Sequence, residues 1–167
     1  GGFNRRSDDD LLRLIAGSRE LEPFDALVQR HECDLYRVVY LLTGSAASAR
    51  QWTVDVFCRI YRDPGAFIGR GPFECVLYAA ALDVVESQRG GGKKAPSSAD
   101  EEASGASIGG SDGAGHRLLM GALERLKQHH RAAFVLSEYE GLNDDDVARI
   151  MNTSASAGRS RASRHRA

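Results

Sequence analysis

The residues whose types and spacing most clearly support chemistry lie at the end of the chain. The last 12 residues contain four arginines and neither Asp nor Glu. A guanidinium can bind a DNA phosphate or donate paired hydrogen bonds to guanine, and a serine hydroxyl can donate to the DNA backbone. The candidate DNA-binding residues are Ser154, Ser156, Arg159, Ser160, Arg161, Ser163, Arg164 and Arg166.

The preceding residues complete the pattern of a helix-turn-helix motif. Asn143 can cap a helix whose first turn, 144–146, is all aspartate, and negative charge is favourable at a helix N-terminus. A short polar turn at 152–154 and the basic segment follow. A short helix, a tight turn and a basic second helix suit insertion into the major groove. The alternative is a basic tail without specific contacts.

Other candidate sites have weaker patterns. Cys33, Cys58 and Cys75 include no Cys-x-x-Cys pair and lie far apart in the sequence, so we expect buried free thiols and no metal site. The run of glycines and lysines at 90–94 lacks the Gly-Lys-Ser/Thr ending of a phosphate-binding loop. No Ser/His/Asp set or carboxylate pair stands out. We therefore expect neither an enzyme nor a cofactor.

The composition changes sharply once along the chain. Residues 90–116 contain 8 of the 18 glycines and five serines, with one large apolar side chain, Ile108. Such a segment cannot offset the entropy of its own ordering and is typical of a flexible linker. We expect two small domains at 7–88 and 117–167, joined by a linker at 89–116.

Charge and hydrophobicity limit the partners. The 167 residues carry a net charge of −1, whereas residues 117–167 alone carry nine basic and six acidic side chains. Attraction to DNA should therefore reside in the C-terminal domain. No run of about 18 apolar residues is present, so we expect no membrane span. The first residues do not suit a signal peptide and the cysteines are few, so we expect a reducing, cytoplasmic setting.

Both domains have the apolar periodicity of helices, and no stretch alternates long enough to indicate a sheet. We expect an all-α fold of two small helical domains. The first helix should follow Ser7, the second should end at Gly44, and a capping box of Ser48 and Gln51 should open the third. The other expected helices lie near 73–84, 118–126 and 129–139, with two short ones around 152–154.

The order of these segments resembles the extracytoplasmic-function (ECF) sigma factors of bacterial RNA polymerase. The likeness covers nearly the whole chain and is strongest over 123–154, which is similar to the family's Leu-rich helix, Glu-Gly-Leu turn and start of the helix-turn-helix. Shorter likenesses occur at Asp9–Leu12, Phe24–Leu27, Asp55–Phe57, Phe73 and Leu77–Tyr78. The resemblance implies that the N-terminal domain binds core RNA polymerase and the melted promoter element. It also implies that the C-terminal domain binds the double-stranded upstream element.

The chain departs from the family's pattern where the family docks on core polymerase. Arg50 and Gln51 stand where the family usually has acidic residues, and Val54 stands where it usually has Gln. The reversed charge at Arg50 should weaken docking, because like charges across an interface reduce affinity. The resemblance implies partner-binding roles for Arg50, Gln51, Val54, Asp55 and Phe57.

The helix that resembles the promoter-melting element also departs from the pattern. Residues 71–88 contain no Lys or Arg and three acids, Glu74, Asp83 and Glu86. Binding of melted DNA requires cations and exposed aromatic rings, and Tyr78 is the one aromatic that we expect to be exposed there. The candidate residues of this helix are Tyr78 and Asp83.

Two hypotheses remain open. One is a sigma-like transcription factor that works with RNA polymerase. The other is a divergent sigma-like regulator that acts by binding a protein, such as an anti-sigma factor or another transcription protein.

Overall fold

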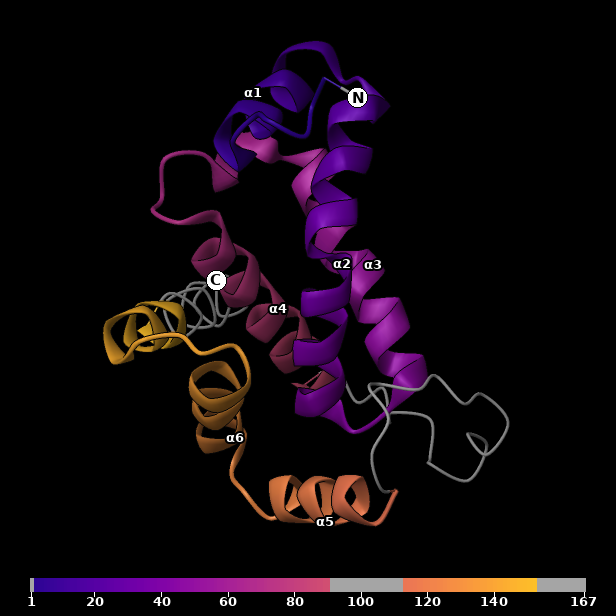
Figure 1. Cartoon of the computed structure of the whole chain (residues 1–167), viewed down its shortest axis with the longest axis vertical. Helices are drawn as coiled ribbons and strands as arrows, with labels where there is room; N and C mark the ends of the chain where they lie inside the picture. The colour runs from indigo at the N-terminus through magenta and orange to yellow at the C-terminus, as the bar shows by residue number, and fades with distance from the viewer. Residues whose placement is uncertain (1, 91–112, 153–167) are drawn as a thin grey trace, which may run out of the picture.

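The computed structural model describes residues 2–90 and 113–152, and every regular element in these ranges is helical (Figure 1). The first unit, 2–90, contains α1 (Asp8–Ser18), α2 (Leu21–Thr43), α3 (Ala46–Arg62), the 3₁₀ turn η1 (Pro64–Phe67) and α4 (Phe73–Gly90). The second unit, 113–152, contains α5 (Gly113–Glu124), α6 (Gln128–Phe134), the π-helical turn η3 (Val135–Tyr139) and a helix over 144–152. The predicted all-α fold is confirmed.

Local capping signals determine several helix ends. The Ser7 hydroxyl accepts a hydrogen bond from the Asp10 amide at 3.1 Å and begins α1 as expected. α2 ends at Gly44, whose φ of +74° favours glycine. The expected cap at Ser48 is wrong, because the hydroxyl of Ser45 accepts from the Ser48 amide at 3.2 Å and α3 begins three residues earlier.

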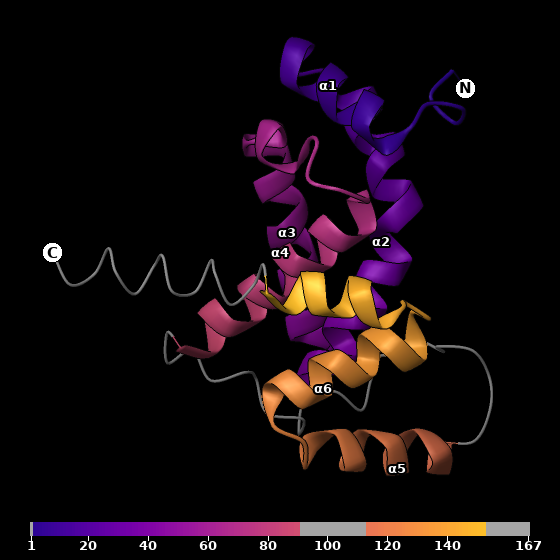
Figure 2. The same ribbon diagram turned by 90° about the vertical axis from the view of Figure 1, so that its left-hand side faces the viewer.

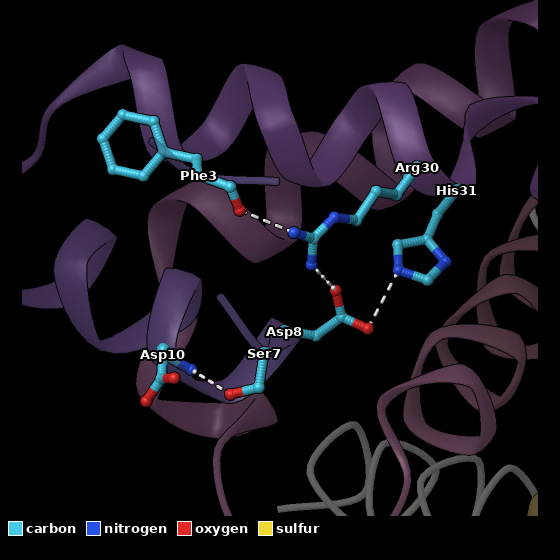
Figure 3. A network of polar contacts seen from close by, with 6 residues as sticks. All are labelled: Phe3, Ser7, Asp8, Asp10, Arg30 and His31. Atoms are coloured by element: carbon cyan, nitrogen blue, oxygen red, sulfur yellow. Dashed lines mark hydrogen bonds and ion pairs between the residues drawn. The ribbon is translucent and has the colours of Figure 1, made fainter. Parts of the chain in front are cut away.

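A polar network attaches α1 to α2 (Figure 3). The Asp8 carboxylate accepts from Arg30 at 3.0 Å and lies 3.1 Å from Nε2 of His31. Arg30 also donates to the backbone carbonyl of Phe3 at 2.7 Å. The hydrogen bond with His31, assisted by Arg30, lowers the pKa of Asp8 despite its partial burial.

The buried apolar side chains of both units belong to one connected core. The first unit contributes large residues such as Leu12, Leu35 and Leu77, and the second contributes Leu123, Leu136 and Ile150. Figure 2 shows the helix over 144–152 crossing in front of α4 and α2. The second unit is therefore packed against the first in this structure.

The helices adjoining the expected linker are longer than predicted. α4 continues to Gly90, and α5 begins at Gly113 instead of after residue 116. Residues 89–90 and 113–116 are thus helical, and 91–112 lie outside the described residues. The glycine-rich composition concealed these ends, because glycine lowers helix propensity without forbidding a terminal turn.

Candidate functional site

The first half of the predicted helix-turn-helix is present. The side-chain oxygen of Asn143 accepts from the Asp146 amide at 2.8 Å and caps the helix over 144–152. Ile150 is buried in the core, and Val147 and Met151 are half-buried against it. The predicted DNA-binding residues lie outside the described residues: Ser154, Ser156, Arg159, Ser160, Arg161, Ser163, Arg164 and Arg166.

An open groove of about 410 Å³ lies between α2 and α3. Its lining residues are Glu32, Cys33, Tyr36, Arg50, Thr53 and Val54. The side chain of Val54 is 58% exposed, and the hydroxyl oxygen of Thr53 is buried without a hydrogen-bond partner. Figures 1 and 2 show α3 on the side of the bundle away from α6 and the helix over 144–152. The groove therefore remains open when the second unit is packed in place.

The predicted partner-binding residues fall into two groups. Arg50, Gln51 and Val54 are exposed on α3, and Asp55 is half-buried. Phe57 is buried, and its ring packs edge-on against Phe24 with centroids 6.4 Å apart. The Phe57 ring thus supports α3 from inside the core, and its contact with a partner stays a prediction.

The two candidate residues of the promoter-melting-like helix are buried. Tyr78 is 3% exposed, contrary to the expectation of an exposed aromatic, and its hydroxyl donates to Oε2 of Glu140 at 2.9 Å. Asp83 is 7% exposed and accepts from Arg59 at 2.6 Å. Neither side chain is available to DNA in this arrangement. Burial, followed by the Glu140 carboxylate, raises the pKa of Tyr78.

This burial changes the surface charge expected for α4. Of the three acids predicted to face outward, Glu74 and Glu86 are exposed, whereas Asp83 is neutralised by Arg59 inside the bundle. The one basic residue of α4 is Arg89, at its C-terminal end. The exposed side chains of α4 are thus still ill-suited to bind DNA phosphates.

Sequence analysis missed two residues that join the units, Arg131 and Glu140. Arg131 is 4% exposed and donates from Nε to the Leu41 carbonyl at 2.6 Å. Burial, and then the charge of Arg89, lowers the pKa of Arg131. The sequence offered one clue: Arg131 shares a helix face with Val135, which is fully buried. No comparable signal distinguished Glu140.

The cysteines also differ from expectation. Cys33 and Cys58 are exposed, and only Cys75 is buried as predicted. Within 2–90 and 113–152, no group of three or more His, Cys, Asp or Glu side chains is arranged to hold a metal ion. In the same ranges, no helix combines the length and apolar character needed to cross a membrane.

Comparison with known proteins agrees with the order of these structural elements. The family Sigma-70, region 4 matches residues 116–167, which include most of α5, all of α6 and the helix over 144–152. Across its full length the chain is 26% identical to the ECF RNA polymerase sigma factor SigM of Mycobacterium tuberculosis, and it covers 85% of that protein. The all-helical fold, the region 4 match and the full-length similarity together support the resemblance of the chain to the ECF-type sigma factors, as a divergent relative.

Proposed function

We propose that the chain acts in transcription initiation by binding duplex promoter DNA through residues 117–167 and core RNA polymerase through the α2–α3 groove. It acts by binding rather than by catalysis, needs no cofactor and works in the cytoplasm beside the polymerase. The observation that carries the proposal is the open groove, because it lies on the α3 surface where the family resemblance implies core docking.

The chemistry of the groove suits a protein partner. Val54 presents apolar surface whose burial would favour association. Arg50 adds a positive charge to the lining. An apolar centre with a few polar groups is typical of protein interfaces.

The proposed DNA contact depends on the C-terminal arginines. Each arginine that binds a phosphate releases counterions, so affinity should fall steeply with salt concentration. The capped helix over 144–152 supports this proposal, because the first helix of a helix-turn-helix positions the second in the major groove of DNA.

A second function is favoured by α4. Tyr78 and Asp83 are buried, and the exposed acids Glu74 and Glu86 would repel DNA phosphates. These features favour a divergent sigma-like regulator with weakened promoter melting. Such a regulator would act through a protein partner, for example an anti-sigma factor or another transcription protein.

Copurification distinguishes the two functions. The full-length chain carrying an affinity tag is used to capture partners from cells of its source, and the captured proteins are identified by mass spectrometry. Recovery of the core polymerase subunits supports the first function. Recovery of one small protein without those subunits supports the second.

A charge reversal then tests the groove. The family's usual acidic residues on this helix imply a basic docking surface on core polymerase. Arg50→Glu should therefore raise the affinity for core polymerase about fivefold, which corresponds to roughly 1 kcal/mol for an exposed ion pair. Arg62→Glu, an exposed charge on α3 outside the groove lining, is the matched control. If both variants bind core polymerase equally, the groove is not the docking site.

A further inference from the structure

Arg131, on α6, carries a buried charge without the acidic partner that such a charge usually has. The residue is 4% exposed, and its Nε donates to the Leu41 carbonyl at 2.6 Å. Its Nη2 atom is buried and has no hydrogen-bond partner among the described residues. No ion pair formed within 2–90 and 113–152 includes this guanidinium. Buried charges in proteins are normally paired, because an unpaired charge away from water is costly.

A second guanidinium lies beside the first at the C-terminal end of α2. Arg89, from α4, donates to the Leu42 carbonyl at 3.0 Å, which is the next carbonyl after the one that Arg131 binds. Burial, and then the charge of Arg89, lowers the pKa of Arg131. The last carbonyls of a helix carry only partial negative charge, so they offset two full positive charges incompletely. Within the described ranges Arg89 forms no ion pair either.

Gln128 adds a third donor to the two guanidinium groups. Its Oε1 accepts from Arg89 at 2.6 Å, whereas its Nε2 is buried and has no hydrogen-bond partner among the described residues. Gln128 lies three residues before Arg131 on α6, so the two side chains share a helix face. A buried donor without an acceptor is destabilising, and here two occur on one face of one helix. We call Arg89, Gln128 and Arg131 the donor cluster; it has donors in excess and lacks an acceptor.

The residues next to the donor cluster are a glycine and the ends of flexible side chains. A Cβ atom at Gly44 would lie 3.7 Å from Nη2 of Arg131. It would also lie 3.6 Å from Cε of Met120 and 3.9 Å from Oε1 of Glu124. The Glu124 carboxylate attracts Arg131 without forming an ion pair with it in the described structure. Arg89 and Glu124 are both exposed, so a solute can reach the donors by displacing these side chains.

We propose that the donor cluster is a binding site for a phosphate-class oxyanion, held by both guanidinium groups and by the amide of Gln128. A guanidinium donates paired hydrogen bonds to phosphate oxygens, and a tetrahedral dianion supplies acceptors in several directions and the charge that two arginines require. Residues 125–131 contain three basic side chains and no acid, which also favours an anion. The site is separate from the α2–α3 groove and from the predicted DNA-binding residues. The same chemistry is offered by free phosphate and by the phosphate monoester of a metabolite.

Thermal melting of the full-length chain tests the site. Sodium phosphate is compared with sodium chloride at equal ionic strength and about pH 7.5, in a buffer free of other oxyanions. An anion that binds only the folded state raises Tm in a saturable way, by about 5–10 °C at roughly one hundred times its Kd. Glycerol phosphate, with glycerol as its control, distinguishes the two sources. A rise with both phosphates assigns the site to phosphorylated metabolites, and a rise with inorganic phosphate alone assigns it to the free ion.

Two variants with opposite effects on stability locate the site. Gln128→Glu keeps the acceptor for Arg89 and replaces the unpartnered amide with a negative oxygen. It should raise Tm in chloride and weaken phosphate binding tenfold or more, because the anion is then built in. Arg89→Gln removes one of the two cations and should also weaken phosphate binding about tenfold, as expected for a lost hydrogen bond to a charged group. The phosphate-dependent shift of each variant is measured against its own Tm in chloride.

Two further variants supply the control and the opposite sign. Arg125→Gln removes an exposed cation outside the donor cluster and should keep the full response to phosphate. Glu124→Gln removes the carboxylate that competes for Arg131 and should tighten phosphate binding.

Three results would overturn the site. The first is a parent Tm that rises no more in phosphate than in chloride. The second is an equal loss of the response in Arg125→Gln and Arg89→Gln, which would show diffuse attraction to a positive surface. The third is an unchanged response in Gln128→Glu. If Arg89→Gln does not fold, Gln128→Glu and Glu124→Gln decide, because the site requires them to change phosphate affinity in opposite directions.

Discussion

Removing the Asp83 carboxylate should destabilise the protein, although sequence alone assigned this residue to the surface. The carboxylate accepts from Nη1 of Arg59 at 2.6 Å, between α3 and α4. Breaking a fully buried ion pair costs about 3–5 kcal/mol, because the remaining charge is left without a partner. The Arg59 side chain is 34% exposed and can regain water, so we expect Asp83→Ala to cost about 2–3 kcal/mol.

Thermal melting followed by circular dichroism at pH 7 measures this cost. In a domain of this length each kcal/mol shifts Tm by about 2–4 °C, so Asp83→Ala should lower Tm by about 4–12 °C. Asp83→Asn keeps an oxygen acceptor for Arg59 and should lower Tm by less. Glu86→Ala changes an exposed acid on the same helix and should remain within about 0.5 kcal/mol of the parent.

A melting point for Asp83→Ala indistinguishable from that of Glu86→Ala would refute the buried pair.

The buried pair also changes how the effect of the α4 charges on DNA binding should be tested. Replacing Glu74, Asp83 and Glu86 with arginine would place a second cation beside Arg59. The repulsion would disrupt the packing of α4 against α3. Glu74→Arg with Glu86→Arg leaves the pair intact and should raise DNA affinity if this face approaches phosphates.

Three further predictions concern α1, the helix cap and the C-terminal arginines. Because the pKa of Asp8 in the folded state lies below its unfolded value, the ionised carboxylate stabilises the fold above about pH 4, and this stabilisation is lost as the pH falls through the folded pKa. Urea melts should therefore show that the free energy of unfolding of the parent approaches that of Asp8→Asn in acid. Asn143→Ala should cost about 1 kcal/mol and lower Tm by about 2–4 °C in the same melting assay. Replacing three arginines with alanine should reduce the slope of log affinity against log salt by about three in fluorescence anisotropy with duplex promoter DNA; the residues are Arg159, Arg161 and Arg164.

The sequence by itself determined the helices and many of their ends. Ser7 begins α1, Gly44 ends α2, and Asn143 begins the helix over 144–152, as their types and neighbours predict. These signals are reliable because a cap is a hydrogen bond, or a backbone angle, within a few residues of the helix end. The exception is α3, where the sequence indicated a cap at Ser48 and Ser45, three residues earlier, forms it.

Only the tertiary structure decided which side chains of α4 face solvent. This helix has apolar residues around most of its circumference, so periodicity did not reveal which face a neighbour covers. Tyr78 and Asp83 are buried and hydrogen-bonded to residues outside α4, Glu140 and Arg59. The residues that bind each other across the units are separated by 62 positions for Tyr78 and Glu140 and by 90 for Arg131 and Leu41. Periodicity and capping reflect hydrogen bonds between near neighbours, whereas burial depends on which distant helix packs alongside, and that is settled only when the whole chain has folded.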